Sequence, residues 1–179
     1  MAVTTEMTAT RETGLARLEI YLPRAARYDK ERNYDTEDHE NVSCLSPYLR
    51  HRLITEEEVL ARVLAEHRYA AVDKFVQEVC WRTYWKGWLQ MRAAVWRDYR
   101  QGVARAAEQL DRAAEGRYAA AVAGETGIAC LNHWARELVE TGYLHNHARM
   151  WFASIWIFTL QLPWALGADF FLRHLRDGD

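Results

Sequence analysis

The sequence predicts an all-α globular fold. Half of its 179 residues are hydrophobic and only three are proline, a composition that can fill a core and that argues against disorder. Alanine, leucine, arginine and glutamate dominate, and these residues are good helix formers. The chain shows no strand-like alternation, internal repeat or low-complexity tract. Its length favours one domain.

Charge and cysteine content narrow the function classes. The net charge is −2, so the chain lacks the overall basic excess of most nucleic-acid binders, and DNA binding would need a local basic patch. The three cysteines, Cys44, Cys80 and Cys130, are odd in number and widely spaced, and residues 1–14 contain no apolar signal-peptide region. These features predict reduced thiols and a cytoplasmic protein.

The stretch from Met150 to Leu172 is rich in tryptophan, phenylalanine, isoleucine and leucine. It is nearly long enough to span a bilayer, but Gln161, Pro163 and Asp169 interrupt it. The stretch therefore predicts two buried helices of a soluble core, broken at Pro163, and no membrane association.

Helix-start and helix-stop residues predict the order of the elements. Ser46-Pro47 indicates a helix start in which serine caps the free amides and proline takes the first helical position. Thr55 and Glu58 have the spacing of a capping box, and Gly142 indicates a helix stop. The expected helical segments are 10–32, a helix from Ser46, 55–67, 69–101, 103–115, 128–141, 151–162 and 164–175, with a loop over 33–42, a break over 124–127 and a turn over 176–179.

The segment 42–49 places two hydroxyls, those of Ser43 and Ser46, and several backbone amides at a predicted helix N-terminus. Such an end attracts phosphate through its unpaired amides and the helix dipole. An ordinary serine N-cap uses the same residues and is far more common. Taken alone, the segment therefore favours a cap.

Glu78, Trp81 and Arg82 share one face of the predicted helix over 69–101, because they follow i, i+3, i+4 spacing. A surface ion pair between Glu78 and Arg82, with Trp81 in the core, explains these residues without a ligand. That interpretation is favoured unless the face lines a cleft.

The densest polar cluster is His145 to Met150, beside the most apolar helix. Arg149 in such a place needs a carboxylate partner, because an unpaired buried charge is costly. Asp177 and Asp179 are the nearest carboxylates in the sequence that can fold back.

Four ligand-capable side chains raise the question of a metal site. Cys130, His133, His145 and His147 follow C-x2-H and H-x-H spacing, which is not a standard zinc pattern. The sequence therefore predicts no metal site, and no nucleophile elbow supports a hydrolase.

Six short motifs, in this order, resemble the C-terminal FAD-binding domain of photolyases and cryptochromes. The resemblance runs from Tyr28 to the end of the chain and is weakest over 103–124. Trp164, thirteen residues before Asp177, falls where the family has an electron-transfer tryptophan. The motifs are Tyr28-x3-Arg32, Ser43-x-Leu45-Ser46-Pro47-Tyr48-Leu49, Glu78-x2-Trp81-Arg82, Thr126-Gly127, Thr141-Gly142-x2-His145-Asn146-x2-Arg149-Met150 and Asp177-Gly178-Asp179.

The resemblance implies a helical domain over residues 28–179 that holds a U-shaped FAD, preceded by an N-terminal helix and linker over 1–27. It implies that Arg149 and Asp177 form an ion pair beside the isoalloxazine ring, where a fixed cation favours the anionic, reduced flavin. The cofactor-binding residues that it implies are Tyr28, Ser43, Leu45, Ser46, Arg149, Asp177 and Asp179.

The resemblance also implies DNA repair, in which light-excited reduced flavin donates an electron to a pyrimidine dimer. A flipped dimer needs an aromatic wall on which to stack and polar groups that read its edge. The implied catalytic residues are Glu78, Asn146 and Trp164, and the implied substrate-binding residues are Glu78, Trp81, Arg82, Asn146 and Met150.

The sequence departs from the family pattern at several positions. Cys44 and His147 stand where the family usually has arginine, Asn132 where it usually has aspartate, and Phe75 where some members have tryptophan. The N-terminal antenna domain and the last part of the FAD domain have no counterpart in the sequence. A truncated domain is therefore expected, with a partner chain or a homo-oligomer to complete the FAD pocket.

Two alternative functions remain at this stage. One is a cryptochrome-like FAD-binding light or redox sensor without repair activity, which does not need the dimer-facing residues. The other is a non-catalytic remnant in which the motif residues serve only packing. Retention of Glu78, Trp81, Asn146 and Met150 favours repair.

Overall fold

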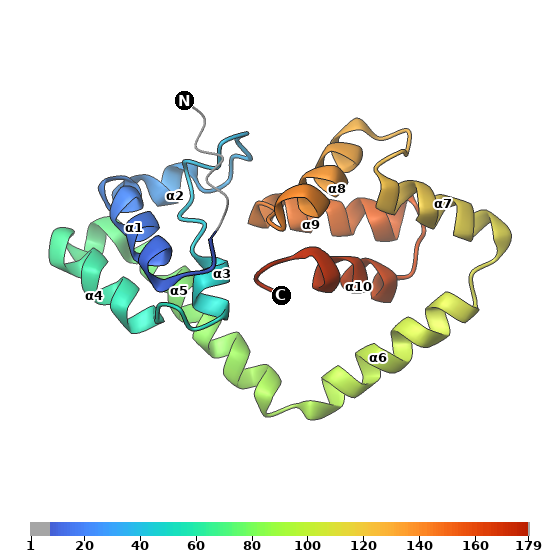
Figure 1. Ribbon diagram of the computed structural model, residues 1–179, viewed down its shortest axis with the longest axis horizontal. Helices are drawn as coiled ribbons and strands as arrows, with labels where there is room; N and C mark the ends of the chain where they lie inside the picture. The colour runs from blue at the N-terminus through green and yellow to red at the C-terminus, as the bar shows by residue number, and fades with distance from the viewer. Residues whose placement is uncertain (1–7, 179) are drawn as a thin grey trace. The chain divides into compact units, whose positions relative to one another are not determined.

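The computed structural model describes residues 8–178, which form helices and loops and contain no strand (Figure 1). The chain divides into two compact units, the first ending at Met91 and the second beginning at Arg92. Each unit has its own hydrophobic core. The all-α class is therefore confirmed. The family domain boundary expected before Tyr28 stays a prediction.

The first unit consists of short N-terminal helices that pack on one long helix. Tyr21, Leu45, Tyr48, Val63 and Phe75 lie among its buried core residues, and a valine, leucine or phenylalanine side chain contributes about 1.5–3 kcal/mol when fully buried. Its elements are α1 (Arg11–Tyr21), a 3-10 helix (Leu22–Arg27), α2 (Tyr28–Glu31), α3 (Ser46–Arg50), α4 (Glu56–Glu66) and α5 (Tyr69–Gln90).

The two helix starts predicted in the first unit have different outcomes. The capping box of α4 is confirmed, since Thr55 Oγ1 accepts from Glu58 N at 3.2 Å and Glu58 Oε2 accepts from Thr55 N at 2.9 Å. The Ser46 cap is wrong, because Ser46 is already the first residue of α3 and Leu45 is its N-cap. Leu45 has a right-handed helical backbone (φ −85°, ψ −9°), so the turn begins before the serine reaches the extended geometry that a cap requires.

The second unit contains five α-helices and one π-helical turn among its described residues. Phe152, Trp156 and Phe170 stack in its core, with ring centroids 5.7–6.3 Å apart, a spacing typical of favourable aromatic pairs. Its elements are α6 (Ala93–Glu108), α7 (Arg112–Ala123), α8 (Ala129–Thr141), α9 (Asn146–Ser154), a π-helix (Ile155–Thr159) and α10 (Trp164–His174).

Several predicted boundaries of the second half hold, but the helix predicted over 103–115 is wrong, because residues 109–111 separate α6 from α7. Gly124 and Gly142 end α7 and α8 in the left-handed conformation, with φ of 67° and 70°, which is the usual role of a C-terminal glycine. The single helix predicted over 69–101 is wrong. It breaks at Arg92, whose backbone (φ −127°, ψ 60°) leaves the helix, although no glycine or proline marks this position.

The apolar stretch 150–172 forms two helical parts separated by residues 160–163, as expected from Pro163. Trp156 closes the break by donating its indole N–H to the Pro163 carbonyl at 3.0 Å. The prediction of two buried helices is confirmed only in part, because Trp156 and Phe170 are buried but Phe158 and Trp164 are 76% and 59% exposed. Within residues 8–178, no helix is long and apolar enough to cross a membrane.

Candidate functional site

The clearest polar feature of the second unit is an ion pair between Arg149, on α9, and Asp177, after α10. The guanidinium donates to both carboxylate oxygens, from NH1 to Oδ1 at 3.1 Å and from NH2 to Oδ2 at 2.6 Å. Its Nε also donates to the carbonyl of Leu144 at 2.9 Å. Asp177 is only 1% exposed, and bidentate pairs of this kind are strong and geometrically specific. The pairing predicted for Arg149 is therefore confirmed with Asp177, whereas Asp179 lies outside the described residues.

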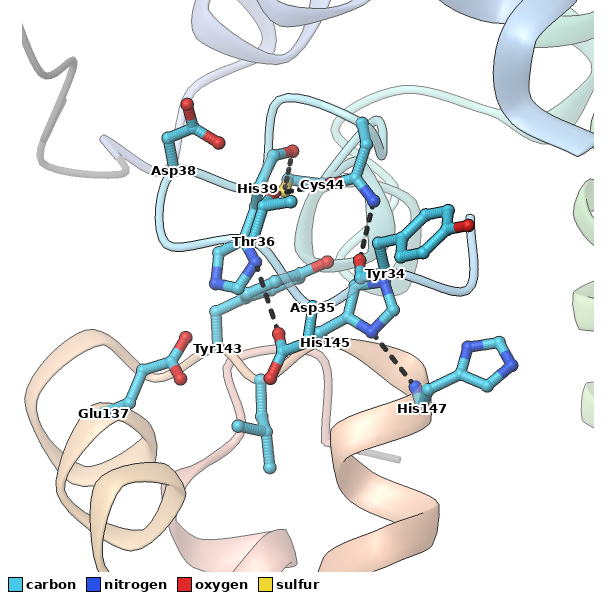
Figure 2. Close-up of polar contacts among 12 residues, drawn as sticks. Tyr34, Asp35, Thr36, Asp38, His39, Cys44, Glu137, Tyr143, His145 and His147 are labelled. Atoms are coloured by element: carbon cyan, nitrogen blue, oxygen red, sulfur yellow. Dashed lines mark hydrogen bonds and ion pairs between the residues drawn. The ribbon is translucent and has the colours of Figure 1, made fainter. Parts of the chain in front are cut away.

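Local capping and turn chemistry place the two partners. His145 is the N-cap of α9, and its Nδ1 accepts from the backbone N–H of His147 at 3.2 Å (Figure 2). On the other side, Gly178 (φ 57°) donates its N–H to the Leu175 carbonyl at 3.0 Å. This turn folds the tail sharply after α10, and Asp177 lies within it.

The other residues predicted on α9 have exposed side chains. Asn146 is exposed and Met150 is 60% exposed. His147 stacks on His145 with ring centroids 5.6 Å apart and contacts Trp151 at 5.9 Å. His147, which stands where the family usually has arginine, thus belongs to a row of rings along the helix.

In the first unit, Glu78 on α5 pairs with Arg32, and Lys74 lies 3.9 Å from the same carboxylate. The guanidinium carbon of Arg32 lies 5.8 Å from the ring centroid of Tyr28. Burial raises the pKa of Tyr28, and the nearby Glu78 carboxylate raises it further, while Arg32 acts in the opposite direction. Three motif residues, Tyr28, Arg32 and Glu78, are thus brought together.

The partner of Glu78 was missed from the sequence, which suggested Arg82 on the same helix face. Arg32 lies 46 positions earlier in the chain, and helical spacing carries no information across that distance. The sequence did single out Tyr28 and Arg32 through the Tyr28-x3-Arg32 motif, but a motif does not show which residues they contact.

Trp81 lies on an aromatic face of α5 rather than in the core. It is 49% exposed, and its ring lies 5.4 Å from that of Tyr84 and 6.4 Å from that of Trp85. Trp88 extends this face, 5.8 Å from Trp85. The interpretation of Trp81 as a core residue is therefore wrong for the first unit.

A basic patch accompanies this aromatic face. Burial lowers the pKa of Lys86, and the neighbouring cations Arg52, Arg82 and Arg50 lower it further, while Glu56 raises it. Three cations thus lie close enough to Lys86 to lower its pKa, and one of them, Arg52, also pairs with Glu56. The net charge of the chain does not reveal this patch, because acidic residues elsewhere cancel it.

The loop between α2 and α3 carries Ser43 and Leu45, two of the residues predicted to bind the cofactor. Asn41 orders it, donating to the carbonyls of Glu31 at 2.8 Å and Tyr34 at 2.7 Å. Figure 2 shows part of this loop, in which the Cys44 thiol lies 3.9 Å from the His39 carbonyl. Cys44 is buried with φ 50°, a backbone conformation that is uncommon for residues other than glycine.

The remaining predicted residues differ in accessibility. Ser43 and Ser46 are partly buried, Leu45 is 2% exposed and packs in the core, and Trp164 is 59% exposed at the start of α10. A ligand could therefore contact the backbone of Leu45 but not its buried side chain. Among residues 8–178, no group of three histidine, cysteine, aspartate or glutamate side chains is arranged to hold a metal.

Comparison with known proteins gives the class of this chain. The sequence model described as "FAD binding domain of DNA photolyase" matches residues 75–179, which is more than half of the chain. The chain therefore belongs to the family of photolyase FAD-binding domains.

Individual relatives agree with this assignment. The deoxyribodipyrimidine photo-lyase of Synechococcus sp. is 29% identical over 173 residues, which is 92% of this chain and 35% of the relative. That of Thermus thermophilus is 32% identical over 170 residues, 94% of this chain and 39% of the relative. A class III photolyase from Agrobacterium tumefaciens has the same fold, with a TM-score of 0.77 and 22% identity over 95% of this chain and 35% of that chain. The chain spans little more than a third of the length of these relatives.

Proposed function

We propose that this chain binds FAD and that Arg149 and Asp177 contact its isoalloxazine ring. The observation that carries the proposal is the buried, bidentate Arg149–Asp177 pair in a chain of the photolyase FAD-binding family. The proposed contacts of the phosphate and ribitol portions of FAD remain Tyr28, Ser43, Leu45 and Ser46.

The donor chemistry of the pair fits a flavin. Three N–H groups of Arg149 are engaged by Asp177 and Leu144 among the described residues, and a guanidinium has five in all. Two donors therefore remain for ring carbonyl and nitrogen atoms. The carboxylate of Asp177 fixes the direction of the guanidinium, and its burial keeps water from competing for that bond.

The fixed cation also determines which redox state is favoured. A guanidinium held beside the ring stabilises negative charge there and favours the reduced, anionic flavin. When bound, reduced FAD would supply blue-light absorption and the electron that splits a pyrimidine dimer. The side chains need only bind, orient and exclude water.

We also propose that the chain binds damaged DNA carrying a pyrimidine dimer. Trp81 offers an exposed aromatic surface of the kind on which a flipped base stacks. The cations around Lys86 supply the local positive charge that phosphate contacts need. Asn146 and Met150 are exposed, so packing within the described residues does not account for them. These observations favour repair over a sensor or a purely structural remnant.

The FAD proposal is tested by comparing two arginine variants. Arg149→Ala removes the guanidinium that Asp177 holds, whereas Arg136→Ala removes an exposed arginine on α8. We expect Arg149→Ala to weaken FAD binding by at least about tenfold, since charged hydrogen bonds contribute about 1.5–3 kcal/mol each. Arg136→Ala should match the wild type in an equilibrium titration. Equal FAD affinity in the two variants would rule out the role of Arg149.

A further inference from the structure

We propose that the turn Thr141–Leu144, between α8 and α9, is the element that positions both members of the Arg149–Asp177 pair, and that Gly142 is its positioning residue. The inference rests on the proposed function, because the pair is taken to contact FAD. It adds a residue that touches neither the proposed cofactor nor the proposed substrate. Three groups of contacts within the second unit carry it.

The first group builds the turn itself. Gly142 ends α8 with φ 70° and donates its N–H to the Leu138 carbonyl at 2.9 Å. The Thr141 hydroxyl donates to the Glu137 carbonyl at 2.7 Å and accepts the N–H of Tyr143 at 3.0 Å. The side chain of Thr141 and the backbone freedom of Gly142 therefore fix the direction in which the chain leaves the helix.

The second group ties the tail to this turn. The backbone N–H of Arg176, the residue before Asp177, donates to the Gly142 carbonyl at 2.9 Å. The Arg176 side chain lies directly over the glycine, so a Cβ at position 142 would be 2.6 Å from Arg176 Cγ and 2.9 Å from its Nε. Real Cβ contacts are essentially never this short, so a side chain at position 142 must push the Arg176 side chain aside or move the tail that carries it.

The third group ties Arg149 to the same turn. Its Nε donates to the Leu144 carbonyl at 2.9 Å, and its guanidinium carbon lies 5.9 Å from the ring centroid of Tyr143. The Gly142 carbonyl thus holds Asp177 through the backbone of Arg176. The Leu144 carbonyl, two residues further on, holds Arg149 directly.

One short turn therefore sets the distance between cation and carboxylate. Both oxygens of Asp177 are used at 3.1 and 2.6 Å, so a shift of about one ångström in the tail breaks at least one bond. A site that depends on a fixed charge loses function with displacements of this size.

The test compares two glycines that follow a threonine. Gly142→Ala introduces the clash with the Arg176 side chain and also places alanine at φ 70°, a strained conformation. Gly127→Ala is the control for replacing a glycine, because Gly127 does not have a positive φ and a Cβ there meets nothing within 4 Å. The first measurement is amide hydrogen exchange in the ligand-free chain, over residues 172–178 and over α7. In the Gly142→Ala variant we expect the amides of the tail to exchange about tenfold faster than in the wild type, because hydrogen exchange reports local opening. The exchange rates of the α7 amides should not change. Gly127→Ala should exchange like the wild type in both.

The second measurement is FAD affinity, with a rescue variant. Gly142→Ala should bind FAD at least about tenfold more weakly than Gly127→Ala, as expected for a displaced guanidinium–carboxylate pair. Arg176→Ala removes the atoms that a Cβ at position 142 would meet. The double variant Gly142→Ala/Arg176→Ala should therefore regain part of the affinity, which a general loss of stability would not allow.

Three outcomes decide the matter. Wild-type tail exchange in Gly142→Ala, faster exchange throughout the unit, or equal effects of the two glycine variants would overturn the positioning role. A wild-type chain that binds no FAD while Gly142→Ala still releases the tail would overturn the proposed function and support the positioning of the pair. If Gly142→Ala does not fold, Thr141→Val keeps the side-chain shape and removes the hydroxyl contacts, and it should show the same tail exchange at smaller amplitude.

Discussion

At the scale of single residues, Asp177 is a buried carboxylate on which an arginine depends. It is buried and holds the guanidinium of Arg149 through two bonds. Asp177→Ala leaves that cation without its carboxylate, and breaking a buried pair in this way costs about 3 kcal/mol. Chemical denaturation of the ligand-free chain measures this. The control is Asp98→Ala, which removes an exposed carboxylate from α6. Equal unfolding free energies for the two variants would contradict the importance of the pair.

Asn132, which stands where the family usually has aspartate, makes hydrogen bonds that use both ends of its amide. Its Oδ1 accepts from the backbone N–H of Thr126 at 2.8 Å and from its hydroxyl at 2.6 Å, while its Nδ2 donates to the Thr126 carbonyl at 2.6 Å. An aspartate cannot make the last bond. Asn132→Asp should therefore lower the unfolding free energy by about 1–2 kcal/mol, as measured by thermal unfolding at neutral pH. An unchanged or higher stability would show that this donor contributes nothing.

Trp81 separates cofactor binding from DNA binding. Its side chain is 49% exposed, so Trp81→Ala should fold and retain FAD while its affinity for dimer-containing DNA falls about tenfold, since base–aromatic stacking contributes about 1–3 kcal/mol. Trp96→Ala is the matched control, because Trp96 is 54% exposed on α6. Filter binding to oligonucleotides with and without a dimer tests this. An unchanged DNA affinity in Trp81→Ala would mean that this residue is not part of the DNA-binding surface.

At the scale of elements, we expect the start of α4 to lose stability at acid pH, because it depends on the Glu58 carboxylate. The Glu58 carboxylate pairs with Arg11 of α1 and accepts from the Thr55 amide. These bonds lower the pKa of Glu58 from its ordinary value of 4.5 to about 2, and the bond with Arg11 has the largest effect. Because the folded carboxylate resists protonation, its stabilisation is present above pH 4.5 and is lost as the pH falls from 4.5 to about 2.

A single substitution should remove this acid response. Glu58→Gln does not titrate, so its melting temperature should fall less than that of the wild type between about pH 5 and pH 2. Glu57→Gln, on the same helical turn, keeps the pair and should follow the wild type. Parallel curves for Glu58→Gln and the wild type would contradict this account of the helix start.

Helix ends could be predicted from the sequence wherever a local side chain or glycine sets them. The capping box of Thr55, the stop at Gly142 and the break at Pro163 all depend on residues within one turn. The end of α5 depends on no such residue, since the helical pattern runs on through Arg92 and no glycine or proline marks the break there. The Ser46 cap failed because the backbone of Leu45 had already become helical.

At the scale of the whole molecule, the all-α class follows from composition and periodicity, whereas the contacts of the site follow only in part. Arg149–Asp177 was predictable, because a cation in apolar surroundings needs a carboxylate and few follow it in the chain. Arg32–Glu78 and Gly142–Arg176 were not, because both depend on how separate helices and turns pack. The exposure of Trp81 was likewise set by packing, which leaves one face of α5 uncovered.

The central claim is that residues of this chain hold FAD, although the chain spans little more than a third of its photolyase relatives. The most direct measurement is the visible absorption spectrum of the purified chain after incubation with FAD and desalting. We predict that the oxidised-flavin spectrum is retained by the wild type. A wild-type protein that is folded by circular dichroism and colourless after desalting, at concentrations at which the photolyase domain family retains its cofactor, would contradict the claim.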